Sequence, residues 1–322
     1  MIGTDIQKAA ALLQAGEVIG MPTETVYGLA GNALNAQAVA KIFAIKKRPT
    51  FDPLIVHIFD LSQIELLSKS SLSESFYVLA NRFWPGPLTL VVEKSDAVPD
   101  IVTSGLSTVG IRMPAHPMAQ QLLRLCNLPL AAPSANPFGY ISPVTAEHVA
   151  RQLGDQVPYI LDGGRCQIGL ESTIVDCTVS PVRILRKGGI SIDNISEALG
   201  YKPDVQTHST DNPRAPGMLS SHYAPCKKLI LTDKEEVFHR NIGREDTAFL
   251  LFTTPVLGHP EQRILSPNGS DAEAAANLFF YLRELDENPH IQLIIAQKAP
   301  EHGLGPAIND RLRRAATIVD CK

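Results

Sequence analysis

Segments with helical patterns and segments with strand-like patterns alternate through the chain up to about residue 205. Apolar side chains recur every three or four positions after Asp5 and again after Asn35, and both residues can cap a helix. Short apolar runs predict strands near 18–21, 54–58, 88–92, 109–112, 130–132, 159–161, 172–176 and 182–185. Further helices are expected near 73–83, 116–125, 146–153 and 192–199. This alternation predicts an α/β domain.

A stretch rich in proline and polar residues, 201–225, separates this domain from the rest of the chain. It shows no lasting periodicity, which is typical of a connecting segment. Beyond it, strands are expected near 229–231, 248–252 and 292–296, and a helix near 271–287. We therefore expect a first domain over 1–205, a linker over 206–226 and a smaller C-terminal α/β domain over 227–322.

The charge of the chain limits its partners. The 29 basic and 33 acidic side chains leave a formal net charge of -4, so the overall field would repel a polyanion. Any contact with nucleic acid or a nucleotide must therefore be local. The five cysteines form no C-x-x-C pair and are expected to be reduced thiols. Without the pattern of a secretory signal or a membrane-spanning run, the expected location is cytoplasmic.

Polar side chains gather where expected strands end. Thr23 and Thr25 offer hydroxyl groups, and Glu24 offers a carboxylate that can orient a cation or an amine. A capped turn would use the same three residues. Arg112 ends an otherwise apolar strand, where its guanidinium needs an anionic partner. That partner is either a substrate carboxylate or a structural Asp or Glu.

A basic cluster, Lys46, Lys47 and Arg48, stands at the end of an expected helix, just before Pro49. The helix dipole favours cations at that position. Lys and Arg together also suit a triphosphate, because Arg presents a planar fork to phosphate oxygens and Lys a point charge. His57 follows in a strand and, taken alone, is more often a core histidine than a ligand.

Small residues, glycines and hydroxyl groups recur in the segments 131–136, 139–145 and 168–176, and further cations in 183–190. Small side chains let a ligand approach the backbone, and free N–H groups at a helix start attract phosphate. Ordinary turns and caps would use the same residues. The chain has no Walker A loop, strand-linked G-x-G-x-x-G, H-E-x-x-H or G-x-S-x-G motif, which excludes the common nucleotide-binding, zinc and serine-hydrolase motifs.

Eight segments of the first domain form an ordered series: PTETVYGL from Pro22, KKR from Lys46, DPLIVH from Asp52, WPGPLTL from Trp84, VGIRMP from Val109, APSAN from Ala132, LESTIVD from Leu170 and RKGGI from Arg186. This series resembles the YrdC-like L-threonylcarbamoyladenylate synthase family. PGMLSSHYAP from Pro216 and GLGPAINDRLRRAA from Gly303 resemble its long form, which adds a second domain through a linker. The resemblance covers nearly all of the chain and implies a twisted, open mixed sheet with a concave basic groove.

The resemblance also implies a reaction in two parts. Bicarbonate carboxylates the amine of L-threonine, and the carbamate then attacks the α-phosphate of ATP. The products are threonylcarbamoyladenylate, used for tRNA threonylcarbamoyladenosine modification, and pyrophosphate. Mg²⁺ is expected to arrive with ATP and not in a protein cage. A TsaD-type transferase is the implied receiver of the product, so tRNA would take part indirectly.

Matched position by position, the resemblance implies a role for each of a set of residues. Contacts with threonine are implied for Thr25, His57, Arg112 and Ser172. The implied catalytic cations, which hold phosphates and the carbamate, are Lys46 and Arg48. Contacts with ATP are implied for Arg48, Asp52, Thr108, Ala132, Ser134, Asn136, Ser142, Arg186 and Tyr223. Asp52 matches a position that often carries another polar residue. Tyr223 lies in the linker, which is expected to close over the nucleotide as a lid.

Two other functions are consistent with part of the pattern. A non-catalytic module that binds double-stranded RNA or tRNA would also use a basic groove. The net acidity, the single Trp84 and the lack of a stripe of basic and aromatic residues argue against it. A carbamoyl-transfer role, as in hydrogenase-maturation proteins, would be accompanied by paired C-x-x-C fingers, and this chain has none.

Overall fold

The computed structural model describes residues 1–69, 71–207, 215–216 and 223–319, so most of the expected linker lies outside the described residues. The chain divides into two compact units. The first unit comprises Met1–Phe138, Ser142–Gln167 and Glu171–Ser220. The second unit comprises Gly139–Ile141, Ile168–Leu170 and Ser221–Lys322. Two short segments from the N-terminal part of the chain therefore belong to the second unit.

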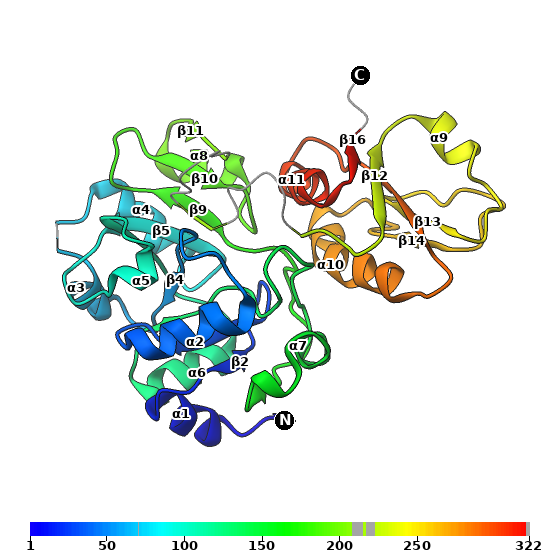
Figure 1. Ribbon diagram of the computed structural model, residues 1–322. Coiled ribbons are helices and arrows are strands. Elements are labelled where there is room, and N and C mark those ends of the chain that lie inside the picture. The colour runs from blue at the N-terminus through cyan, green and yellow to red at the C-terminus, as the bar shows by residue number, and fades with distance from the viewer. Residues whose placement is uncertain (70, 208–214, 217–222, 320–322) are drawn as a thin grey trace. The chain divides into compact units, whose positions relative to one another are not determined.

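The first unit is built on a mixed sheet of 11 strands (Figure 1). In spatial order these are β1 (Ile2–Gly3), β8 (Ile160–Leu161), β2 (Ile19–Met21), β3 (Gly28–Asn32), β7 (Leu130–Ala131), β4 (Ile55–His57), β6 (Thr108–Arg112), β5 (Leu88–Glu93), β9 (Thr173–Asp176), β10 (Arg183–Arg186) and β11 (Asp204–Val205). Strand β4 pairs with β6 in parallel, whereas β5 pairs with β6 antiparallel. The predicted α/β class and mixed sheet are confirmed.

Helices of the first unit begin where the capping residues predict. The Asp5 side chain accepts a hydrogen bond from the backbone N–H of Lys8, and the Asn35 side chain accepts two at the start of the next helix. The longer helices are α1 (Ile6–Gln14), α2 (Ala36–Lys46), α4 (Glu74–Phe83), α6 (Pro117–Cys126), α7 (Ala146–Leu153) and α8 (Ile192–Leu199). The short ones are α3 (Ile64–Leu67) and α5 (Asp100–Thr103). Helices α1 and α6 pack together in one apolar cluster with β2.

Strand β3 was not expected, because its sequence GLAGN has weak strand propensity. Packing explains its glycines. A Cβ atom on Gly31 would lie 3.2 Å from Val18 Cγ1 and 3.3 Å from Ile42 Cδ1, and one on Gly28 would lie 3.1 Å from the Cβ of Ala132. The strand is thus specified by close tertiary packing and not by local preference.

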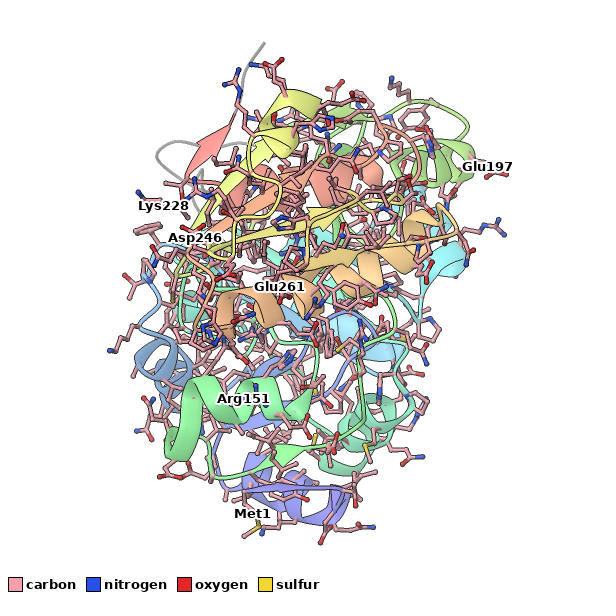
Figure 2. The ribbon with its side chains drawn as sticks, turned by 90° about the vertical axis from the view of Figure 1, so that its right-hand side faces the viewer. Met1, Arg151, Glu197, Lys228, Asp246 and Glu261 are labelled. Carbon is pink, nitrogen blue, oxygen red and sulfur yellow. The ribbon has the colours of Figure 1, made fainter. Side chains whose placement is uncertain are left out.

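The second unit contains a parallel sheet of five strands. In spatial order these are β14 (Gln262–Ile264), β13 (Thr247–Leu251), β15 (Leu293–Gln297), β12 (Lys228–Thr232) and β16 (Ile318–Val319). Lys228, Asp246 and Glu261, labelled in Figure 2, stand at or just before the starts of β12, β13 and β14. The helices are α9 (Glu235–His239), α10 (Asp271–Glu287) and α11 (Gly305–Ala315).

The sequence predicts α10 with its observed bounds but does not predict α11. Helix α11 buries polar side chains, and this polarity masks its helical pattern in the sequence. The buried polar residues are Asn309, Asp310, Arg311 and Arg314. Asp310 accepts hydrogen bonds from Arg311 and Arg314 at 3.0 and 2.9 Å, which compensates for burying the charges. Within the described part of the chain, no helix is both long and apolar enough to cross a membrane.

Candidate functional site

Four buried side chains gather at the ends of β2, β4 and β6, and we call them the Arg112 group: Glu24, Thr25, His57 and Arg112. Strands β4 and β6 pair so that His57 and Arg112 are register partners. Arg112 donates through Nη1 to Thr25 Oγ1 at 2.8 Å, and its Nη2 lies 2.6 Å from Glu24 Oε1. Its Nε donates to the Gly86 carbonyl at 3.2 Å. Three predicted threonine contacts, Thr25, His57 and Arg112, therefore lie together.

The loop after β2 contains both features that its sequence allows, a capped turn and side chains that bind a cation. Thr23 makes a turn: its hydroxyl donates to the Val26 carbonyl at 2.6 Å and accepts from the backbone N–H groups of Thr25 and Val26. Glu24 and Thr25 instead bond to Arg112. The structural partner that Arg112 needed is thus Glu24, and the turn made by Thr23 holds Glu24 and Thr25 in place.

Arg112 retains donors for a ligand. A guanidinium has five N–H groups, and the hydrogen bonds to Gly86, Thr25 and Glu24 use three of them, on Nε, Nη1 and Nη2. One N–H on each terminal nitrogen is left, a pair that can bind a carboxylate. Among the described residues, Glu24 Oε2 and His57 Nδ1 are buried without a hydrogen-bond partner. Glu24 Oε2 is available as an acceptor, and so is His57 Nδ1 in the tautomer that carries the proton on Nε2.

Burial and charge set the ionisation of this group. Burial raises the pKa of Glu24, but the charge and hydrogen bond of Arg112 outweigh it, so the pKa is lowered and Glu24 stays ionised. Burial, reinforced by the positive charge of Arg112, lowers the pKa of His57 to about 3. His57 is therefore a neutral imidazole near pH 7, which suits an acceptor of a ligand hydroxyl or amine.

A second cluster, which we call the basic group, is formed by Lys46, Arg48, Asp52 and Arg186. Lys46 Nζ donates to the carbonyl of Ser134 and to that of Asn136, both at 2.5 Å. Arg48 Nη2 lies 2.7 Å from Asp52 Oδ2 and donates to the Pro53 carbonyl at 2.9 Å.

All members of the basic group are buried. Burial and the neighbouring Arg48 charge lower the pKa of Lys46 well below its usual value. Burial raises the pKa of Asp52, opposed by the positive charges of Arg48, Lys46 and Arg186. These cations already bond to protein atoms. The concave basic groove implied by the family resemblance stays a prediction.

Ser172 links the two clusters. Its Oγ lies 2.7 Å from Thr89 Oγ1 and accepts a hydrogen bond from Arg186 Nη2 at 3.0 Å. Thr89 is the register partner of Arg112 across β5 and β6, so both side chains point to the same face of the sheet. The bonded hydroxyls of Thr89 and Ser172 thus join Arg186 to the face of the sheet on which Arg112 lies.

The other predicted ATP contacts occupy varied positions. Ser134 and Asn136 present their carbonyls to Lys46, and the buried Ser142 hydroxyl donates to Glu171 Oε1 at 2.6 Å. Ala132 packs against Gly28. Thr108 lines a small cavity with Ala215 and Pro216, and the Pro216 carbonyl accepts a hydrogen bond from Arg186 Nη1 at 3.2 Å.

Tyr223 belongs to the second unit, where its ring is buried. The ring centroid lies 5.5 Å from that of Phe279, and the guanidinium of Arg311 lies 5.2 Å from it. Its contact with ATP stays a prediction, as do the roles of the other residues.

Three residues that the sequence did not single out take part in these clusters: Gly86, Thr89 and Glu171. Each lies inside a segment that carries the family resemblance, WPGPLTL or LESTIVD. Their position within those segments is the signal in the sequence that could have indicated a role for them. Their partners are far away in sequence, so the contacts themselves could not be predicted.

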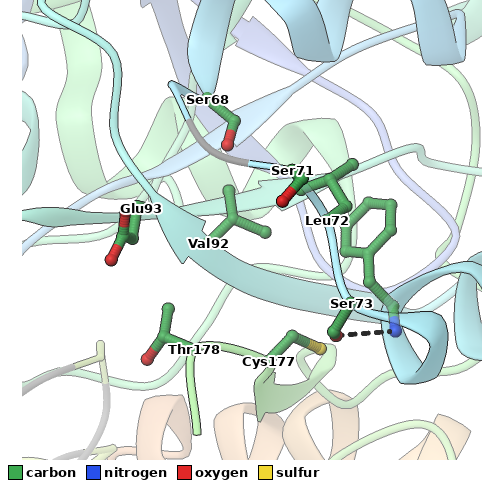
Figure 3. A pocket seen from close by; sticks show the side chains of 9 residues that line it. Ser68, Ser71, Leu72, Ser73, Val92, Glu93, Cys177 and Thr178 are labelled. Carbon is green, nitrogen blue, oxygen red and sulfur yellow. Dashed lines mark hydrogen bonds between the residues drawn. The ribbon is translucent and has the colours of Figure 1, made fainter.

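The described residues also form a separate cavity of about 320 Å³ beside β5. Ser73, Cys177 and Thr178 line it together with Val92, as Figure 3 shows. None of the predicted site residues contributes to its wall. In the part of the chain that the structure describes, no three His, Cys, Asp or Glu side chains gather where they could hold a metal ion.

The low pKa of His57 predicts an acid-dependent loss of stability. The folded-state pKa of about 3 lies below the ordinary 6.5, so between these values the unfolded chain binds a proton that the folded chain does not. The free energy of unfolding should fall as pH decreases through this window, by at most about 1.4 kcal/mol per pH unit from this group. Urea unfolding measured from pH 7 to pH 4 should show a shallower fall for His57→Gln than for the unmodified protein.

The exposed His290→Asn variant is the control and should follow the curve of the unmodified protein. Equal slopes for His57→Gln and the unmodified protein would contradict this assignment.

Comparisons with known proteins match both the N-terminal and the C-terminal part of the chain. Residues 11–188 match the Sua5/YciO/YrdC family model, described as telomere recombination, and residues 190–317 match that of the threonylcarbamoyl-AMP synthase C-terminal domain. The chain is 41% identical over 320 residues to the threonylcarbamoyl-AMP synthase of Pyrococcus abyssi (strain GE5 / Orsay), covering 97% of this chain and 94% of that one. It is 42% identical over 328 residues to that of Bacillus subtilis (strain 168), covering 97% and 92%. The crystal structure of P. abyssi Sua5 complexed with L-threonine matches with a TM-score of 0.90 at 38% identity, covering 98% of this chain and 96% of that one.

Proposed function

Because the chain belongs to the Sua5/YciO/YrdC family, we propose that it is a threonylcarbamoyl-AMP synthase that joins L-threonine, bicarbonate and ATP. The observation that supports this most directly is the Arg112 group. In this group Arg112 is ion-paired and has two N–H groups left for a ligand, and Thr25 supplies a hydroxyl. His57 supplies a neutral imidazole, and Glu24 supplies a carboxylate with one oxygen left to accept a hydrogen bond. These are the groups that an amino acid with a hydroxyl side chain requires.

In the proposed reaction, Arg112 binds the carboxylate of threonine, and His57 and Glu24 accept hydrogen bonds from its hydroxyl and amine. The amine nitrogen bonds to the carbon of bicarbonate, and water leaves after proton transfer. A carbamate oxygen then bonds to the α-phosphorus of ATP, while the bond from that phosphorus to the oxygen of the leaving pyrophosphate breaks. A carbamate is short-lived in water, so the gain comes mainly from proximity and exclusion of solvent.

The basic group would meet the negative charge that develops on the phosphates. Arg48 and Arg186 provide forks for phosphate oxygens, and Lys46, which donates to the carbonyls of Ser134 and Asn136, would be the third group to hold the phosphates and the carbamate. ATP would bring Mg²⁺ with its phosphates. We further propose that a TsaD-type transferase receives the adenylate in the cytoplasm for the modification of tRNA.

This function predicts that pyrophosphate forms only when both threonine and bicarbonate are present. Purified protein with ATP should release pyrophosphate in the complete mixture and only background amounts after either omission. Omission of bicarbonate requires degassed buffer, and addition of bicarbonate to the same sample should restore release. Pyrophosphate release without threonine would contradict the proposal. Binding of tRNA without any such turnover would favour the RNA-binding alternative.

A further inference from the structure

Helix α10 of the second unit is buried on two faces. Leu278, Leu282 and Leu285 supply an apolar face of the usual kind. Other buried residues, spaced three or four positions apart, form what we call the second face of α10: Ala275, Phe279, Arg283 and Asp286. A buried Arg and Asp on a helix must have partners. Arg283 has one on the same helix, Glu287 at 4.0 Å, and both buried residues also bond to distant segments of the chain.

The segment Gly139–Ile141 is bound to this second face. The Tyr140 hydroxyl donates to Asp286 Oδ2 at 2.5 Å, and Arg283 Nη2 donates to the Ile141 carbonyl at 2.7 Å. The guanidinium of Arg283 also lies 5.3 Å from the centre of the Tyr140 ring. Burial, with the hydrogen bond to Asp286, raises the pKa of Tyr140, so its hydroxyl remains a donor.

The segment Ile168–Leu170 lies on the backbone of the same helix. Gly169 has a φ of +70°, and a Cβ atom there would lie 2.5 Å from the Ala275 carbonyl oxygen and 2.6 Å from Ala276 Cα. A larger residue would require the segment or the helix to move.

Each bound segment is followed at once by a residue connected with the candidate nucleotide site. Ser142, a predicted ATP contact, follows Ile141, and its hydrogen-bond partner Glu171 follows Leu170. The Ser142 hydroxyl donates to Glu171 Oε1 at 2.6 Å, so the two chain segments meet again directly after leaving α10. The second face of α10 therefore fixes the backbone from which Ser142 and Glu171 extend.

We propose that Tyr140 and Asp286 are positioning residues for ATP, acting through Ser142. This inference rests on the proposed function, because the contact of Ser142 with ATP is part of that proposal. It gives the second unit a defined task in the reaction: its helix α10 sets the position of a nucleotide-binding hydroxyl. Neither residue needs to touch ATP.

The test compares binding of two ligands to the full chain, a nonhydrolysable ATP analogue and L-threonine, by calorimetry. Tyr140→Phe keeps the ring and removes the hydroxyl. It should raise the Kd of the ATP analogue about tenfold, as expected for a small displacement of a binding group, and leave the Kd of threonine within about twofold. Glu284 lies on the same helix and forms an exposed ion pair with Arg263 of β14; Glu284→Gln is therefore the matched control and should change neither Kd.

A second variant tests the same idea through the other segment. Gly169→Ala should weaken both ligands, because Glu171 bonds to Ser142 while Ser172 is next in the chain and is a predicted threonine contact. If Tyr140→Phe leaves the Kd of the ATP analogue unchanged, or weakens both ligands equally with a lowered melting temperature, the positioning role is wrong. Failure of the proposed function is seen separately, as unmodified protein that binds the analogue but makes no pyrophosphate. Unmodified protein that does not bind the analogue would overturn both proposals.

Discussion

Replacing Arg112 with alanine should weaken the use of threonine far more than the binding of ATP. The guanidinium is buried, and removing one partner of a desolvated ion pair with a substrate carboxylate costs about 2 to 5 kcal/mol. We expect the kcat/KM for threonine to fall by about 30-fold to several thousand-fold. The Kd of a nonhydrolysable ATP analogue should change by less than about threefold, since Arg112 belongs to the threonine half of the site.

The effect of Arg112→Ala on threonine use must be separated from its effect on stability. Arg112→Ala leaves Glu24 buried without its cation, which can lower stability on its own. Glu24→Ala with Arg112→Ala removes that unpaired charge, so the melting temperature should recover in part while threonine use stays low. Lys94→Ala breaks an ion pair between the residue that follows β5 and Asp100 at the start of α5, and it serves as the control with unchanged kinetics. Equal losses for threonine and for the ATP analogue would remove Arg112 from the role of carboxylate clamp.

The Arg48→Ala variant should lose most of its turnover. Arg48 is one of the two planar guanidinium forks of the basic group, and removal of one group that stabilises transition-state charge typically lowers kcat by about 100-fold to 1,000-fold. Arg48→Lys keeps the charge but not the fork and should give an intermediate rate. Pyrophosphate release at saturating threonine and bicarbonate, with ATP varied, measures both effects.

Stability again requires a control, because Asp52 loses its ion pair in Arg48→Ala. Lys41→Ala changes a cation on helix α2, which ends two residues before Arg48; Lys41 forms an exposed pair with Glu17, and the variant should behave like the unmodified protein. A kcat for Arg48→Ala within about threefold of the unmodified value, with the protein folded, would exclude Arg48 from the catalytic machinery.

Local patterns predicted much of the fold. The caps at Asp5 and Asn35 and the apolar runs gave the positions of α1, α2, α10 and most strands, since capping and periodicity are local properties. Strand β3 and helix α11 could not be predicted in the same way. Glycines packed against a neighbouring helix specify the first, and buried ion pairs specify the second.

The candidate site shows the same limit. Residue types and the family resemblance identified Thr25, His57, Arg112 and Ser172, but not which partners they meet. Glu24, for example, bonds to Arg112, which lies 88 positions away in the sequence. Contacts over such distances depend on the sheet order, which no local pattern contains.

The central claim is that the Arg112 group and the basic group hold threonine and ATP against each other. A crystal structure with threonine and a nonhydrolysable ATP analogue tests it most directly. We predict the threonine carboxylate on Arg112, its hydroxyl or amine at His57 and Glu24, and the α-phosphate next to Arg48 and Arg186 with the amine facing it. Threonine bound away from Arg112, or an analogue whose phosphates contact none of Lys46, Arg48 and Arg186, would contradict the account.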